Sequence, residues 1–160
     1  MKLAEALIIR KDIYKNLKQL ENRIRRNITI QEGTSAPENS NALLVEYNEQ
    51  HKEYVGLVVK INLTNAKIFL KFYHPIEEKE VEATMTEALA LRDYLKERSS
   101  ALREFAAEAS SSRAVLTRTE VRFKTTMKAS DIQKEQDRTG KLLRQLDLKI
   151  QEKNWNAELE

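Results

Sequence analysis

Apolar residues near the start of the chain recur at alternating spacings of three and four, the heptad pattern of a helix that packs along one seam. The seam positions are Leu3, Ala6, Arg10, Ile13, Leu17, Leu20 and Ile24. This pattern predicts a first long helix that ends at about Ile28. The polar stretch 31–41 contains Gly33 and Pro37 and predicts a loop. A second helix is expected from about Ala42 to Asn65.

After the second helix the pattern changes from helical to alternating. Ile68, Leu70 and Phe72 share one face, which predicts a strand at 67–73, a turn near 74–78 and a return strand at 79–84. Thr84 and Glu87 have the spacing of a capping box, so a third helix should begin there and run to about residue 110.

Two further segments complete the predicted elements. Val121 and Phe123 alternate with basic residues, which predicts an additional strand for the small sheet. Ser130, with a glutamine three residues later, has the spacing of a helix cap and predicts a fourth helix that ends at about Asn154. Gly140 inside this helix indicates a close helix crossing.

The two halves of the chain resemble each other in sequence. Each begins with Glu-Ala-Leu-x-x-Arg, at residues 5–10 and again at 87–92, and each ends with Lys-Ile-x-x-x-Asn, at 60–65 and 149–154. We therefore expect one domain over 1–160, made of pseudo-repeats 1–66 and 84–157 with a β-insert at 67–83. The predicted fold class is mainly α, with two antiparallel helical hairpins forming a four-helix bundle-like core and a small antiparallel β-insert.

The composition excludes several classes of function but does not identify one. The chain has no cysteine, two histidines and a net charge of +3, and its two signs of charge are interleaved. We expect a soluble, cytoplasmic, non-enzymatic protein with no catalytic residue, metal or cofactor, because no nucleophile motif, phosphate loop or metal-ligand spacing occurs. No apolar run is long enough for a membrane span, so we expect no membrane partner.

An arginine occupies the third seam position of both the first and the third helix. A guanidinium group among leucines is unfavourable unless carboxylates or carbonyls satisfy it. We therefore predict a polar layer at one end of the bundle that contains both arginines and nearby amides and carboxylates. Its members are Arg10, Asn62, Asn65, Glu5, Arg92, Asn154, Glu87 and Asp93.

The polar layer has two interpretations. We favour a structural device that sets helix register in a homo-oligomer of this chain. The alternative is a binding site for a small anion or another ligand, or a hydrolytic site, with arginines as donors to carboxylate or phosphate. A third hypothesis is nucleic-acid binding through Phe69, Phe72 and Tyr73, interleaved with lysines, although a buried sheet face explains these residues better.

The chain also resembles a family of small bacterial helical proteins, mostly uncharacterised, some of which are labelled septicolysin. The matching segments are 1–7, 61–65, 86–93 and 149–155, which include the arginine of the third helix and the asparagines above. The resemblance implies a helical core with a small β-insert and an assembled state. The toxin activity implied by the label disagrees with the dense charge of each helix. The insert between Asn65 and Thr84 is longer than in the family, which puts in doubt any site near that turn.

Overall fold

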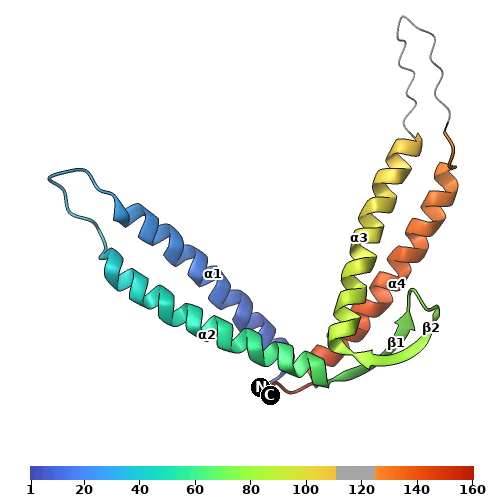
Figure 1. The fold of residues 1–160 in the computed structure, drawn as a ribbon, viewed down its shortest axis with the longest axis horizontal. Coiled ribbons are helices and arrows are strands. Elements are labelled where there is room, and N and C mark those ends of the chain that lie inside the picture. The colour runs from blue at the N-terminus through green and yellow to red at the C-terminus, as the bar shows by residue number, and fades with distance from the viewer. Residues whose placement is uncertain (111–124) are drawn as a thin grey trace, which may run out of the picture. The chain divides into compact units, whose positions relative to one another are not determined.

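The computed structural model describes residues 1–110 and 125–160. Along the chain, two helices are followed by a β-hairpin and then by two more helices (Figure 1). They are α1 (Leu3–Ile28), α2 (Ser40–Lys67), β1 (Phe69–His74), β2 (Lys79–Thr84), α3 (Met85–Ser110) and α4 (Ala129–Asn156). The mainly helical fold with a small antiparallel sheet is confirmed. The chain divides into two compact units, Met1–Ile68 with Gln151–Glu160, and Phe69–Ile150, and each is described by itself.

The first unit is an antiparallel hairpin of α1 and α2 (Figure 1). Ile13, Leu17 and Leu20 of the predicted seam are buried. At the end of the hairpin near the chain termini, Leu3, Ala6 and Ile61 form a core that Leu57 and Leu159 help to cover. The heptad pattern therefore identified the surface of α1 that packs on its neighbour.

The bounds of both helices follow from local chemistry. The Glu5 carboxylate accepts a 2.9 Å hydrogen bond from the Lys2 backbone N–H and so satisfies a donor at the start of α1. Asn39 caps α2, because its side-chain oxygen accepts hydrogen bonds from the backbone N–H groups of Asn41, at 2.9 Å, and Ala42, at 3.2 Å. The cap explains why α2 begins at Ser40, two residues before the predicted start.

The second unit contains the β-hairpin, all of α3 and most of α4. Strands β1 and β2 pair antiparallel from Phe69 opposite Thr84 to His74 opposite Lys79. Leu70 and Phe72 are buried on one face, as the alternation predicted. His74, which was expected in the turn, is the last residue of β1 and is buried on the same face. Strand β1 begins two residues late because α2 continues to Lys67. Helices α3 and α4 lie side by side in this unit, with Leu95, Leu146 and Ile150 among its buried residues (Figure 1).

The two predicted caps of this part of the chain had different outcomes. The Glu87 N–H donates a 3.2 Å bond to the Thr84 hydroxyl, so Thr84 does cap α3. Helix α4 begins at Ala129, and the Lys128 carbonyl accepts its first hydrogen bonds, so Ser130 lies within the helix rather than at its cap. The strand predicted around Val121 and Phe123 lies outside the described residues.

Gly140 does not mark a close helix crossing, and that prediction was wrong. A β-carbon added there would meet only the Arg144 side chain, at an ordinary contact distance of 3.5 Å. The glycine therefore leaves open room beside α4 and does not allow a neighbouring backbone to approach.

Candidate functional site

The residues of the predicted polar layer are distributed over both compact units. Arg10, Glu5, Asn62, Asn65 and Asn154 belong to the first unit, and Glu87, Arg92 and Asp93 belong to the second. Asn65 and Asn154 are buried, both arginines are half-buried, and Asn62 and the three carboxylates are exposed. Each arginine is thus only partly buried within its own unit, and a polar layer shared by both units stays a prediction.

The two arginines differ in their partners. The Arg92 guanidinium donates bonds of 3.2 and 3.1 Å to Asp93 Oδ1, so its charge is compensated by the next residue in the chain. Arg10 has no hydrogen bond or ion pair with any residue of 1–110 or 125–160. A half-buried guanidinium without a partner is the less stable arrangement of the two.

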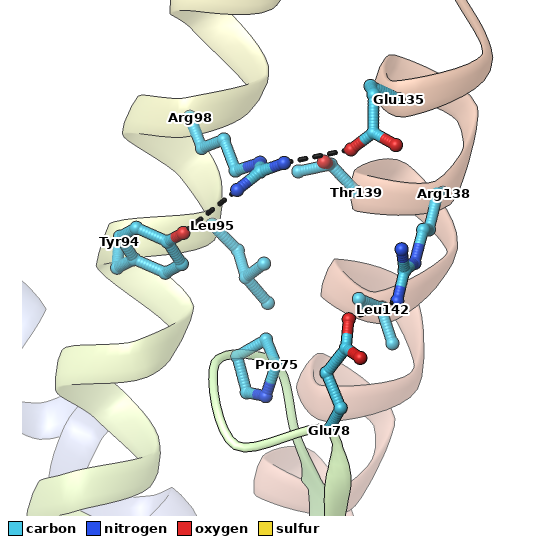
Figure 2. A pocket seen from close by; sticks show the side chains of 9 residues that line it. All are labelled: Pro75, Glu78, Tyr94, Leu95, Arg98, Glu135, Arg138, Thr139 and Leu142. Atoms are coloured by element: carbon cyan, nitrogen blue, oxygen red, sulfur yellow. Dashed lines mark hydrogen bonds and ion pairs between the residues drawn. The ribbon is translucent and has the colours of Figure 1, made fainter.

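A shallow hollow in the second unit contains two other arginines, which the sequence analysis did not select (Figure 2). Arg98 of α3 donates a 3.1 Å bond to the Tyr94 hydroxyl and a 2.8 Å bond to Glu135 of α4. These interactions, first of all the bond to Tyr94, raise the pKa of Arg98. Arg138 reaches the β-hairpin turn and binds Glu78 at 2.5 Å.

This hollow has the geometry of a structural clamp. Each guanidinium faces a carboxylate, so the local charge is balanced and neither arginine is free to bind an anion. The bonds join α3 to α4 and α4 to the turn after β1, which fixes the hairpin beside the helices. Its volume of about 60 Å³ has room for little more than a few water molecules.

The first unit carries a different feature, a row of aromatic rings on the side of its hairpin. Tyr14 of α1 lies 5.9 Å from Tyr54 of α2, between ring centroids. The row continues along α2, where His51 stacks on Tyr54 at 6.2 Å and on Tyr47 at 5.5 Å. Tyr14 and His51 are exposed, whereas the other two rings are half-buried. The rings therefore form a continuous surface that spans both helices.

Charged groups of α1 frame this row. Lys18 lies 5.4 Å from the Tyr14 ring centroid and donates 3.0 Å hydrogen bonds to both carboxylate oxygens of Glu21. The Tyr47 hydroxyl donates a 3.4 Å bond to the same carboxylate. The Lys18 bond lowers the pKa of Glu21, and Glu21 in turn raises the pKa of Lys18. At neutral pH the surface thus presents ionised groups beside aromatic ones.

Aliphatic side chains extend the same surface along α2. Leu44 and Val55 are 47 % and 50 % exposed, and they share a heptad spacing with His51 and the half-buried Val58. We call this surface the open face. It consists of Arg10, Tyr14, Lys18, Glu21, Leu44, Tyr47, His51, Tyr54, Val55 and Val58.

Of these residues, only Arg10 was predicted for a site from the sequence, and the residues of α2 on the open face were not selected. The available signal was a second heptad series along α2, which runs through positions 44, 48, 51, 55 and 58 beside the one that packs on α1. Three of these five positions, Leu44, Val55 and Val58, are apolar, so α2 carries apolar side chains on a second side. The described residues 1–110 and 125–160 contain no cluster of His, Asp and Glu suited to a metal ion.

Sequence and structure comparisons place the chain among proteins whose role is not established. Residues 10–159 match DUF6847, a family of unknown function. The chain belongs to this family. A DUF6847 assignment over nearly the whole length agrees with the predicted resemblance to a family of small, uncharacterised proteins, but it carries no septicolysin label.

A solved structure resembles this DUF6847 chain from end to end. It is the crystal structure of a functionally unknown conserved protein from Corynebacterium diphtheriae, with 31% sequence identity and a TM-score of 0.84. The alignment covers 100% of this chain and 99% of that one. No curated protein matches the chain. Within the described residues, none of the helices has an apolar stretch long enough to cross a membrane.

Proposed function

We propose that this protein is a non-enzymatic helical scaffold that works as a homo-oligomer, with the open face of the α1–α2 hairpin as its self-association surface. The observation that carries this proposal is the exposure of apolar and aromatic side chains from both helices on one continuous side of the hairpin. Self-association would cover them.

The burial pattern of α2 supports the proposal. This helix packs Leu43 and Ile61 on α1, yet it exposes Leu44 and Val55 on the open face. A helix with apolar residues on more than one side is normally buried on more than one side. Two helices form only one interface with each other, whereas four helices can form a bundle with a shared core. A second hairpin would provide the missing surface.

The distribution of exposed apolar residues points to the same unit. Of the 17 large hydrophobic side chains that are exposed in the described parts of the chain, 12 lie in the first unit. Three of these, Tyr14, Leu44 and Val55, lie on the open face. Exposed apolar residues are normal when scattered, but contiguous patches mark interaction surfaces. Tyrosine, which contributes three rings to the open face, is enriched at binding hot spots.

Sedimentation equilibrium with Val55→Glu tests this function. The wild-type chain should sediment as an oligomer, and a charge introduced at Val55 should weaken association at least tenfold, roughly the effect of 1.4 kcal/mol. Val45→Glu is the matched control, because this valine has similar exposure on the same helix but lies about 100° further round it than Leu44. A wild-type chain that stays monomeric up to about 100 μM would contradict the proposal.

A ligand-binding role is the second candidate. The observation that favours it is Arg10, which has no partner among the residues that the structure describes. Its guanidinium could bind a carboxylate or phosphate, with Asn65 and Asn154 of the same unit as further polar groups. Thermal-shift measurements with nucleotides, sugar phosphates and dicarboxylates test this role. A ligand that binds the folded chain raises its melting temperature, and Arg10→Leu should abolish the shift. No shift with any class would count against a site.

A further inference from the structure

The open face has a charge pattern that suits a second copy of itself. Arg10 and Glu21 are eleven residues apart on α1, which is about three helical turns or 16 Å, so they lie on the same side of the helix. Between them lies Tyr14, which contacts Tyr54. The face therefore has the Arg10 cation at one end, the Glu21 carboxylate with its Lys18 partner at the other, and aromatic rings in the middle.

Helix α2 has a pair of uncharged residues with the same spacing, at the same height along the hairpin. Tyr47 and Val58 are also eleven residues apart, with His51 and Tyr54 between them. Contacts between the helices fix their relative height, because Tyr14 is opposite Tyr54 and Glu21 is opposite Tyr47. With this alignment the midpoint of the α1 pair and the midpoint of the α2 pair coincide. The two helices thus share one centre, which lies among the aromatic rings.

We propose that two copies pack open face to open face about a two-fold axis through this centre, with Arg10 of each copy paired with Glu21 of the other. The proposal rests on the proposed function, because it specifies how the self-association surface is used. A two-fold axis at the shared centre exchanges the ends of the face, so the cation of one copy meets the anion of the other twice. It also brings Tyr47 opposite Val58 and joins the two aromatic clusters.

The chemistry of the two charged groups suits such a pair. Arg10 is half-buried and has no partner among the described residues of its own chain. The Glu21 carboxylate is held in place by Lys18 and Tyr47, which leaves lone pairs for a further donor. A guanidinium that binds an ordered carboxylate makes a charge-assisted bond, and a closing interface excludes water from it. The pair would therefore satisfy Arg10 and fix the antiparallel register.

A charge-swap experiment tests the inference on the full chain. The variants are R10E and E21R, studied alone and mixed, with K11E and D12R as controls that change charge at neighbouring exposed positions of α1. Each variant alone would place like charges opposite each other at both pairs, so its association should weaken by about tenfold or more. An R10E copy and an E21R copy are complementary at both pairs, so the mixture should form a heterodimer, measured by native mass spectrometry. The controls should associate like the wild type.

The outcomes separate the inference from the function on which it rests. If Val55→Glu disrupts association but R10E and E21R do not, the scaffold function stands and the proposed axis is wrong. If the mixture fails to form heterodimers although circular dichroism shows both variants folded, the pairing is also wrong. If the wild-type chain is monomeric, both proposals fail.

A disulfide test does not depend on the charge variants. Because the chain has no cysteine, a single introduced thiol reports only on its own surroundings. His51 lies beside the proposed axis, so H51C chains should form a covalent dimer under mild oxidation. K52C is the control, because Lys52 is exposed and lies one residue, or about 100°, further round α2. Equal crosslinking of the two variants, or none, would overturn the proposed axis.

Discussion

The backbone N–H of Glu160 donates a 3.1 Å hydrogen bond to the hydroxyl of Thr64, which joins the last residue of the chain to the end of α2. Thr64 is buried, and its hydroxyl in turn donates a 2.9 Å bond to the Lys60 carbonyl. Nearby, the Leu3 N–H donates to the Ala157 carbonyl, and the Leu159 N–H to the Met1 carbonyl, both at 2.9 Å. The two ends of the chain therefore close the first unit together.

We predict that Thr64→Val destabilises the protein by about 1 kcal/mol, since valine keeps the shape of threonine but leaves the Glu160 N–H without its acceptor. Urea denaturation followed by circular dichroism measures the change. Thr86→Val is the control, because Thr86 is an exposed helical threonine at the start of α3. Equal loss of stability in both variants would show that the effect arises from the hydroxyl in general and not from closure of the chain ends.

Glu38 fastens the loop between α1 and α2, and this contact makes stability depend on pH. The Arg23 guanidinium binds its carboxylate, with Nε 3.2 Å from each oxygen, and the Glu38 N–H donates a 3.1 Å bond to Asn27 Oδ1. The Arg23 hydrogen bond lowers the pKa of Glu38 below its ordinary value of 4.5. Between the two values the unfolded chain binds more protons than the folded one.

The stabilisation from Glu38 should therefore be complete above pH 4.5 and be lost as the pH falls through the lower pKa of the folded state. Glu38→Gln should reduce the pH dependence of the melting temperature in this acidic range. Glu32→Gln, an exposed change in the same loop, is the control. The prediction fails if the two variants have the same acid slope as the wild type.

Sequence periodicity was sufficient for the helices because their buried stripes are regular. The seam of α1 and the alternation of β1 were read correctly because each element packs one face on a neighbour within its own unit. The start of β1 was misplaced because α2 continues through Lys67, where the sequence already alternates. Local pattern alone cannot decide between a helix that extends and a strand that begins.

The residues of the candidate site were harder to predict from sequence, because the exposure of a side chain depends on the segments that pack against it. Tyr54 was not predicted as a site residue, yet its ring lies beside the exposed Tyr14 and His51 rings of the open face. Arg98 and Arg138 were not predicted as site residues, because their carboxylate partners come from distant segments of the sequence. The spacing of residues predicts which face of a helix a side chain lies on. Tertiary packing decides which group lies opposite that face.

His74 holds the turn between β1 and β2 through its ring. Its Nδ1 accepts hydrogen bonds from the backbone N–H groups of Ile76, at 3.3 Å, and Glu77, at 3.1 Å, so the proton of the neutral ring is on Nε2. His74 is buried, and its ring stacks near Phe72. The side chain therefore acts as an acceptor for turn donors, as the side chain of asparagine commonly does.

We predict that His74→Asn is better tolerated than His74→Leu, because the asparagine oxygen can accept the same bonds. Leucine would fill the buried site but leave two donors unpaired, at a cost of about 1–3 kcal/mol. Thermal and urea unfolding of the two variants measure the difference. If leucine is as stable as the wild type, the turn does not depend on the ring nitrogen.

The three glycines of the chain occupy positions with opposite requirements, which gives a prediction with an internal control. Gly56 of α2 has no atom within 4 Å of the place where a β-carbon would lie, and Gly140 of α4 has only the flexible end of Arg144 nearby. Gly33 in the loop has a φ of +83°, a conformation that residues with a β-carbon rarely adopt. Alanine should therefore stabilise the two helical positions, by about 0.5–1 kcal/mol each, and destabilise the loop position. Urea denaturation of Gly56→Ala, Gly140→Ala and Gly33→Ala measures the three changes, and a loss of stability at Gly140 would restore the close helix crossing that the sequence suggested.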